Sequence, residues 1–343
     1  MSAAVRAVFL ASYSGGRPVR EGDFEIRVVA SHELNAGEVR LRPLAFSVDP
    51  YLRGRMTGID NFYLPQFSLG EPLASAGVGR VIESRHPDFS PGDIATGQLA
   101  WSDESVWPAA DQRARRNELK PVDLSLAGPT QWLGALGLNG MCAYFGVLNV
   151  ARPRPGTSFL VSGAAGGIGH LAGQIARIEG CHVVGIAGAL EKCKVLTQRL
   201  GFDAAVSYRS PTLEADLRAV LPGGPDVYFD NVGGALSQTV MWNMPRNGLV
   251  VECGQIATYD DQDGGWTTDI RPIHANGLQW RSFTASHFAE YVPAATAQLG
   301  HWLRTGRVIA LETVLRGLDA LPEAMVGVLA GRNLGKMVVH IDD

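Results

Sequence analysis

The chain has few cysteines and none of the clusters that bind metals. Its four cysteines are Cys142, Cys181, Cys193 and Cys253. They are scattered, they form no Cys-x-x-C pair, and no group of His and Cys has metal-ligand spacing. These absences argue against a structural or catalytic zinc, so we expect no metal site. Scattered thiols in an intracellular chain are most simply buried and reduced.

Long apolar runs and an excess of one charge are also missing. No apolar stretch reaches the roughly 20 residues of a membrane-spanning helix. The apolar segment that follows Met1 is too short for a signal peptide and fits a first strand better. The formal net charge is −4 and no long basic run occurs, which argues against nucleic acid as a partner. We therefore expect a cytoplasmic enzyme with a small-molecule substrate and no membrane or nucleic-acid partner.

The 343 residues suffice for two domains, and the pattern changes along them. Residues 1–125 contain short strand-like segments between Gly/Pro turns, which favours a small β-barrel. Later segments alternate between strand and helix, which predicts a parallel sheet with crossover helices. The predicted strands of that sheet are 158–162, 181–186, 204–208, 226–230 and 248–253. The last segment, 310–341, does not continue the alternation, and we expect it to return to the first domain.

Other segments are predicted from composition and apolar spacing. Residues 132–150 are apolar and helix-permissive, and helices are also expected at 293–305 and 322–329. Residues 260–269 are acidic and rich in glycine, which predicts a flexible loop.

A glycine-rich turn separates the first predicted strand of the sheet from a helix. Residues 163–169 are all small or apolar, and 171–178 carry apolar residues at helical spacing. Strand, glycine turn and helix in this order are typical of dinucleotide binding, although Ala164 takes the place of the first glycine. Gly166 and Gly169 would let backbone N–H groups approach a pyrophosphate at the helix N-terminus. Small-residue turns also occur for packing alone, so that alternative stays open.

The following strand indicates which dinucleotide would bind. It ends at Ala187, where a carboxylate would bind the ribose 2′-hydroxyl of NAD. Lys192 follows within one helical turn, and Tyr208 ends the next predicted strand. Because no acid is present to repel a 2′-phosphate and a cation is near, the sequence favours NADPH. Lys192 could equally be an ordinary solvated lysine at a helix start.

Residues 48–56 combine aromatic and cationic side chains in a compact segment. The functional interpretation is a wall of the active site, with Tyr51 and Arg53 facing substrate or cofactor. The alternative is a turn that carries a surface arginine pair.

Several motifs occur together in a fixed order along nearly the whole chain. They are SVDPYLRGRM (47–56), LGEP (69–72), VSGAAGGIG (161–169), VGIAG (184–188), EKC (191–193), LGFD (200–203), DVYFDNVGG (226–234), CGQI (253–256) and NLGK (333–336). In these motifs the chain resembles the medium-chain dehydrogenase/reductase superfamily. Within it, the chain is similar to the zinc-free prostaglandin reductase (leukotriene B4 12-hydroxydehydrogenase) group, which includes curcumin reductases and alkenal double-bond reductases.

This resemblance implies an α/β fold with two domains. A GroES-like β-barrel domain would comprise residues 1–126 and 308–343, and a Rossmann domain with a doubly wound parallel sheet would comprise 127–307. It implies zinc-independent, NADPH-dependent reduction of the C=C bond of α,β-unsaturated ketones and aldehydes. It also implies a homodimer, built largely through the nucleotide domains.

The resemblance also assigns roles to individual residues. The residues that it places at the cofactor are Gly166, Gly167 and Gly169 at the pyrophosphate, Lys192 and Tyr208 at the 2′-phosphate, Asn231 beside the cofactor, Asn333 near the nicotinamide and its phosphates, and Gly188 and Cys253 from the neighbouring motifs. Tyr259 matches a tyrosine proposed to assist the substrate carbonyl. Together with Tyr51 and Arg53 it completes the catalytic candidates. Tyr259 could instead anchor the acidic loop.

The chain departs from the group at segments that border the substrate pocket. Cys142 replaces a threonine expected near the nicotinamide, and residues 257–260 and 271–274 differ from the usual sequence. The resemblance therefore does not specify the substrate. Quinone reduction, oxidation of an alcohol next to a conjugated system, and NADPH binding without turnover remain as alternatives.

Overall fold

The computed structural model describes residues 4–59, 64–107, 118–259 and 269–341. The chain separates into two compact units. The first comprises residues 1–133, 313–332 and 337–343, and the second comprises 134–312 and 333–336. The expected limits at 126/127 and 307/308 differ from these by several residues, and the assignment of 333–336 to the second unit was not anticipated. The predicted loop at 260–269 lies almost wholly outside the described residues.

The first unit is rich in antiparallel strands. β1 (Ala4–Leu10) pairs with β2 (Phe24–Ala30), and a larger sheet has the order β14-β15-β3-β4-β5-β7 with β6 also on β3. Its strands are β3 (Val39–Ser47), β4 (Ala74–Ser84), β5 (Ile94–Ala100), β6 (Ser105–Trp107), β7 (Lys120–Pro121), β14 (Glu312–Arg316) and β15 (Lys336–His340). Val338 on β15 pairs with Ser47 on β3, so the last strand lies against an early one.

Helix α9 (Leu321–Leu329) closes the core of this unit. The residues that it buries follow helical spacing: Leu321, Ala324, Met325 and Val328. They pack with strand residues such as Leu41 and with Trp101, whose indole nitrogen donates to Ser75 Oγ at 2.7 Å. The apolar stripe of α9 thus fixes it on the strands.

The second unit holds a six-stranded parallel sheet of order β10-β9-β8-β11-β12-β13. Its strands are β8 (Ser158–Val161), β9 (His182–Ala187), β10 (Ala204–Ser207), β11 (Val227–Asp230), β12 (Leu249–Glu252) and β13 (Gln279–Ser282). The strand order reverses beside β8, and ligands of such sheets bind at the carboxyl ends of the strands at this point. The α/β fold class predicted from the sequence is confirmed.

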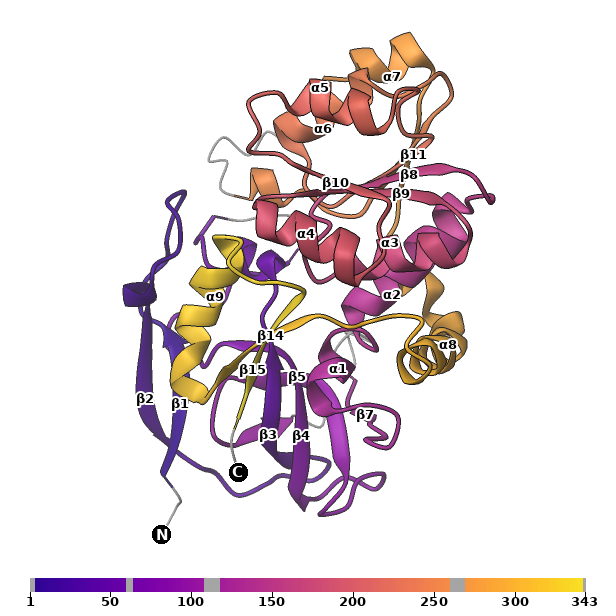
Figure 1. The fold of residues 1–343 in the computed structure, drawn as a ribbon. Helices are drawn as coiled ribbons and strands as arrows, with labels where there is room; N and C mark the ends of the chain where they lie inside the picture. The colour runs from indigo at the N-terminus through magenta and orange to yellow at the C-terminus, as the bar shows by residue number, and fades with distance from the viewer. Residues whose placement is uncertain (1–3, 60–63, 108–117, 260–268, 342–343) are drawn as a thin grey trace. The chain divides into compact units, whose positions relative to one another are not determined.

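Helices cover both faces of this sheet, with α3 and α4 on one side and α5, α6 and α7 on the other (Figure 1). Their bounds are α3 (Gly169–Ile178), α4 (Leu190–Arg199), α5 (Leu213–Val220), α6 (Gly234–Trp242) and α7 (Arg271–Asn276). α8 (Val292–Arg304) follows later in the chain. Both sheet faces are therefore covered, which explains why the central strands are apolar on both sides.

The helix predicted at 132–150 is interrupted, and that prediction was wrong in its extent. α1 (Pro129–Leu133) ends before Gly134, α2 (Leu138–Phe145) starts after Gly137, and a π-helical turn (Gly146–Ala151) follows. Gly137 has an extended backbone, φ −99° and ψ −154°, which no helix contains. Glycine favours such a break because it loses more conformational freedom in a helix than other residues do.

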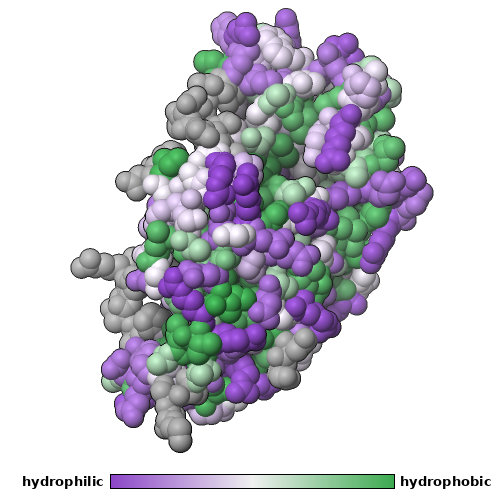
Figure 2. Space-filling view, turned by 90° about the vertical axis from the view of Figure 1, so that its left-hand side faces the viewer, coloured by the Kyte–Doolittle hydropathy of each residue, from purple (hydrophilic) through white to green (hydrophobic). Residues whose placement is uncertain are grey.

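None of the helices in the described part of the chain is long and apolar enough to cross a membrane. On the face drawn in Figure 2, apolar residues are visible in several places with hydrophilic residues between them.

Candidate functional site

The glycine turn between β8 and α3 is closely packed. Gly163 has φ +57°, and its carbonyl accepts a hydrogen bond from Gly166 N at 2.9 Å. A Cβ on Gly169 would lie 2.4 Å from the same carbonyl oxygen, and one on Gly167 would lie 2.6 Å from Asn139 Nδ2. Ala164 is fully buried, and its N–H donates to Ile186 O at 2.9 Å. Its methyl group therefore points into the protein, which explains why alanine is accepted there.

A buried histidine supports this turn from behind. His170 is 1% exposed, and its Nδ1 lies 2.7 Å from Gly166 O, to which it must donate. Its Nε2 accepts from Leu311 N at 3.0 Å, which fixes the neutral tautomer. Burial lowers the pKa of His170 to about 4. Gln174, one turn later, makes two hydrogen bonds with Ile309, 2.8 and 3.0 Å long. The sequence analysis missed both side chains because nothing in it places residues 309–311 behind the turn.

The segment 333–336 lies directly beside the turn. Gly335 N donates to Ala165 O at 2.8 Å, and Gly335 forms an isolated β-bridge with Gly166. Asn333 Nδ2 donates to Gly335 O at 2.7 Å, which shapes the segment. The structure thus brings the C-terminal asparagine of the sequence motif to the glycine turn.

A cluster of cations lies at the end of β9. Lys192 Nζ donates to Asn333 O at 2.6 Å, and it is half-buried rather than a solvated lysine. Tyr208 stands over Gly188, where a Cβ would lie 2.8 Å from the tyrosine hydroxyl. The guanidinium of Arg209 lies 5.8 Å from the centre of the Tyr208 ring.

The two cations of this cluster, Lys192 and Arg209, lie close enough to affect each other. Burial lowers the pKa of Lys192, and the charge of Arg209 lowers it further. Arg209 is exposed, whereas Lys192 is half-buried. Arg209 was not predicted, although its position directly after Tyr208 was a signal.

Asn231 occupies the carboxyl end of β11. Its backbone N–H and its Nδ2 both donate to Ser162, at 2.9 Å to Oγ and 2.8 Å to the carbonyl oxygen. Its Oδ1 is buried and has no hydrogen-bond partner within the described ranges. A buried acceptor of this kind is rare without a water or ligand donor. Asn231 therefore offers an acceptor at the strand ends, where the sequence analysis expected cofactor.

Two cysteines meet near the same edge of the sheet. The Cys142 thiol on α2 interacts with Cys253, which follows β12, and this contact together with burial raises the pKa of Cys253 well above its usual range. The backbone N–H of Cys253 donates to Asp230 O at 2.8 Å. The structure therefore places Cys142 at the end of β12, next to Cys253, which the resemblance places at the cofactor.

Tyr259 follows a short 3₁₀ turn (Ile256–Thr258) beyond β12. The turn is tied to the loop after β11, because Ala257 N donates to Val232 O at 2.9 Å. Tyr259 itself is partly exposed, and the described residues stop there before resuming at 269.

Comparisons with known proteins agree with this arrangement. Residues 6–114 match the family described as the N-terminal domain of oxidoreductase, and 167–299 match the family described as zinc-binding dehydrogenase. The chain is 34% identical to 2-alkenal reductase (NADP(+)-dependent) of Nicotiana tabacum, over 98% of the chain and 97% of the relative. It is 36% identical to prostaglandin reductase 1 of Rattus norvegicus, over 93% and 94%. The chain belongs to the medium-chain dehydrogenase/reductase family.

A solved structure extends this relationship. The crystal structure of CurA from Vibrio vulnificus in complex with NADPH has a TM-score of 0.88 and 29% identity, and covers 98% of this chain and 99% of its own. Within the medium-chain family, the chain thus falls with the reductases that the sequence motifs indicated.

The second family is described as zinc-binding, and zinc in proteins is held by acidic, histidine and cysteine side chains. In the part of the chain that the structure describes, no group of three or more His, Cys, Asp or Glu could hold a metal ion.

The first unit of the reductase corrects one expectation. Arg53, on the 3₁₀ segment Pro50–Arg55, is fully buried and does not face substrate. Its guanidinium donates to Ser14 Oγ at 2.9 Å and to the carbonyl oxygens of Arg17 and Gly15 at 2.8 and 3.2 Å. These acceptors occupy the cation, so Arg53 holds the 14–17 loop. Tyr51 is half-buried and packs against the core of this unit.

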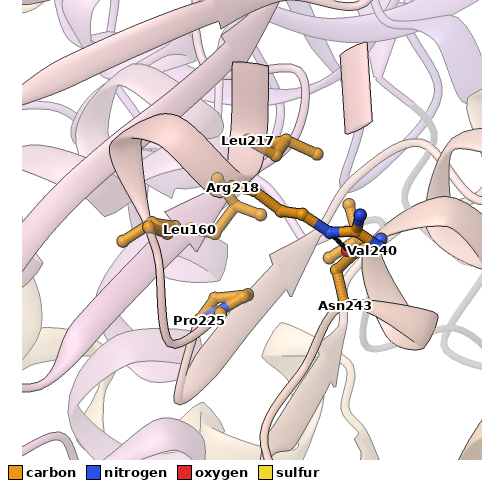
Figure 3. Close-up of a pocket in the computed structure, with 8 residues that line it drawn as sticks. Leu160, Leu217, Arg218, Pro225, Val240 and Asn243 are labelled. Carbon is orange, nitrogen blue, oxygen red and sulfur yellow. Dashed lines mark hydrogen bonds between the residues drawn. The ribbon is translucent and has the colours of Figure 1, made fainter. Parts of the chain in front are cut away.

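A small pocket between β8 and the helices α5 and α6 shares no residue with this site (Figure 3). It holds about 10 Å³, enough for about one water molecule. Arg218 borders it and donates from Nε to Asn243 Oδ1 at 2.9 Å. Leu217, Leu221 and Pro225 provide an apolar lining, so the pocket does not suit a dinucleotide.

Proposed function

We propose that this chain reduces the C=C bond of α,β-unsaturated ketones and aldehydes with NADPH. The observation that carries the proposal is the pair of cations Lys192 and Arg209 with Tyr208 at the end of β9, in a unit that also holds a closely packed glycine turn. This arrangement occurs in a family whose similar members are named as alkenal and prostaglandin reductases.

The residues present suit the pyrophosphate and the 2′-phosphate of NADPH. The glycine turn leaves its backbone open to a pyrophosphate at the start of α3, where the helix dipole favours negative charge. A lysine has three donors, and Lys192 gives one of them to Asn333 O. The Lys192 and Arg209 charges suit a 2′-phosphate dianion. Asn231 Oδ1 suits a donor on the cofactor.

Bound NADPH supplies the hydride for the reaction. The β-carbon of the enone accepts it, and negative charge then develops on the carbonyl oxygen as an enolate. A positioned hydroxyl stabilises this charge, and Tyr259 is our candidate donor. The α-carbon then takes a proton from water or a tyrosine, which completes the addition of two hydrogens. The proposed mechanism needs no metal. Tyr51 remains a candidate for contact with substrate.

The test is the loss of NADPH absorbance with a panel of enones and enals, with NADH and a zinc chelator as parallel controls. We expect chelator-insensitive loss with NADPH and products heavier by two hydrogens that keep the carbonyl. Turnover of quinones or alcohols alone would contradict the proposal. So would NADPH binding without turnover across the panel.

We further propose a homodimer that forms through the second unit. β13 is one of the two edge strands of the parallel sheet and is largely exposed, and such edges need a partner or another means of protection. Light scattering should give twice the chain mass of 36.7 kDa. A monomer at micromolar concentration would contradict this.

A further inference from the structure

A carboxylate that no motif singled out ends β12. The parallel register sets Glu252 opposite Asp230 on β11 and opposite Ser282 on β13. Side chains at paired positions share one face of a sheet, so Glu252 and Asp230 project to the same side. Both stand at the carboxyl ends of their strands, immediately before the loops that carry Asn231 and Tyr259.

Glu252 holds one of these loops through Gln255. Its Oε1 accepts a hydrogen bond from Gln255 Nε2 at 2.8 Å. The other end of that amide lies against the loop after β11, because a Cβ on Gly233 would be 1.8 Å from Gln255 Oε1. Gly233 has φ +71°, so only glycine adopts this backbone readily and leaves the amide this space. Glu252 therefore fixes the position of Gln255, and Gln255 fixes the spacing between the two loops.

Asp230 holds the same glycine loop by different atoms. Its Oδ1 accepts from the backbone N–H groups of Val232 and Gly233 at 2.9 and 3.0 Å, and from Ser162 and Tyr228 hydroxyls. Its other oxygen accepts from Ser237. Both oxygens of Asp230 thus accept hydrogen bonds within its own network, and as an acceptor Asp230 donates none to Glu252.

The second oxygen of Glu252 lacks such support. Glu252 Oε2 is buried and has no hydrogen-bond partner in the ranges that the structure describes. The titratable groups that interact with Glu252 are Asp230 and the adjacent Cys253 thiol, and the side chain of Trp280 on β13 interacts with the carboxyl group and lowers its pKa. Burial, which has the largest effect, and the charge of Asp230 outweigh Gln255 and Trp280 and raise the pKa of Glu252 to about 7. An ionised carboxylate accepts a stronger hydrogen bond than a neutral acid does, so the hold on Gln255 changes with pH near neutrality.

We propose that Glu252 is a positioning residue whose ionisation, through Gln255, sets the loops at 231–234 and 255–259 for cofactor binding. Ionised Glu252 holds Gln255 against Gly233 and strengthens NADPH binding. The proposal rests on the proposed cofactor but not on the enone substrate.

The experiment measures the dissociation constant of NADPH by fluorescence across pH 5.5–8.5 for wild type and Glu252→Gln. Titration of the 2′-phosphate affects both proteins alike, so the ratio of their constants isolates Glu252. We expect this ratio to change about five-fold, the difference between a charge-assisted and a neutral hydrogen bond, with a midpoint near 7. Glu214→Gln, an exposed carboxylate on α5, is the matched control and should keep the wild-type profile.

A second variant separates positioning from general stability. In Gln255→Met, Glu252 still titrates but no longer holds the amide, so the pH-dependent change in affinity should be lost. A Glu252→Gln profile that parallels wild type would overturn the proposal. So would a pH-dependent change that persists in Gln255→Met. Failure of wild type to bind NADPH at any pH would instead contradict the proposed cofactor, and turnover of enones has no part in either result.

Discussion

Among single residues, Tyr259 carries the most direct chemical prediction. Removing one hydrogen-bond donor from a developing oxyanion costs on the order of 2.7–4 kcal/mol in barrier. We expect Tyr259→Phe to lower kcat about 10²- to 10³-fold while the NADPH dissociation constant stays unchanged. Steady-state kinetics with an enone and fluorescence binding measure the two quantities. Wild-type turnover in this variant would remove Tyr259 from the mechanism.

Arg209 carries the prediction for cofactor choice. It lies beside Tyr208. Burial has the larger effect on the pKa of Lys192, and the charge of Arg209 lowers that pKa further. We expect Arg209→Ala to weaken NADPH binding about ten-fold, the worth of one charge-assisted hydrogen bond, and to leave NADH binding unchanged. Lys194→Ala, an exposed cation on α4, is the control. Equal losses for NADPH and NADH would show that Arg209 does not contact the 2′-phosphate.

The residue scale also shows what the sequence could not specify. The motif residues Gly166, Lys192 and Asn333 were singled out, and the structure connects them through the segment 333–336, whereas Tyr208 lies over Gly188 at the end of β9. Arg53 was interpreted wrongly because composition does not tell which carbonyl oxygens a guanidinium will meet after folding. Glu252 and His170 were missed for the same reason, since their roles depend on contacts with Gln255 and Leu311 that only the fold creates.

At the scale of elements, apolar content decided what could be predicted. The central strands β8, β9, β11 and β12 are buried on both faces, and each was predicted within two residues at either end. β13 was missed, because its edge position leaves it largely exposed and its sequence lacks an apolar run. The break between α1 and α2 was missed because a helix can tolerate glycines in an apolar stretch, and the sequence does not tell where the folded chain interrupts the helix.

The turn between β8 and α3 gives the prediction at this scale. A Cβ at Gly169 would lie 2.4 Å from Gly163 O and 2.8 Å from Ala164 Cα, and backbone cannot yield as a flexible side chain can. We expect Gly169→Ala to lower stability by roughly 1–3 kcal/mol and to weaken NADPH binding at the same time. Denaturant unfolding and fluorescence binding measure both. Gly223→Ala, where a Cβ meets nothing within 4 Å, should change neither.

At the scale of the whole molecule, buried His170 and partly buried Glu252 give the free energy of unfolding opposite dependences on pH. The pKa of His170 is lowered to about 4. Between about pH 4 and 6.5 the imidazole is therefore protonated in the unfolded chain but not in the folded chain. This contribution is fully present above pH 6.5 and is lost as pH falls toward 4. The pKa of Glu252 is raised to about 7, so the folded chain holds a proton that the unfolded chain releases. That contribution is present below about pH 4.5 and is lost as pH rises through 7.

The two effects therefore oppose each other between about pH 4.5 and 6.5, and substitution should separate them. When the pH is lowered, the free energy of unfolding should fall by roughly 3 kcal/mol less in His170→Gln than in wild type. When the pH is raised to 8, the free energy of unfolding should fall by about 2 kcal/mol less in Glu252→Gln than in wild type. This difference is smaller because Glu252 is only partly buried. Denaturant unfolding at pH 4.5, 6 and 8 measures both, with His301→Gln, an exposed imidazole, as the control. The residues share no hydrogen-bond partner among those described, so the double variant should show the sum. Parallel pH profiles for wild type and the double variant would mean that other groups dominate the titration.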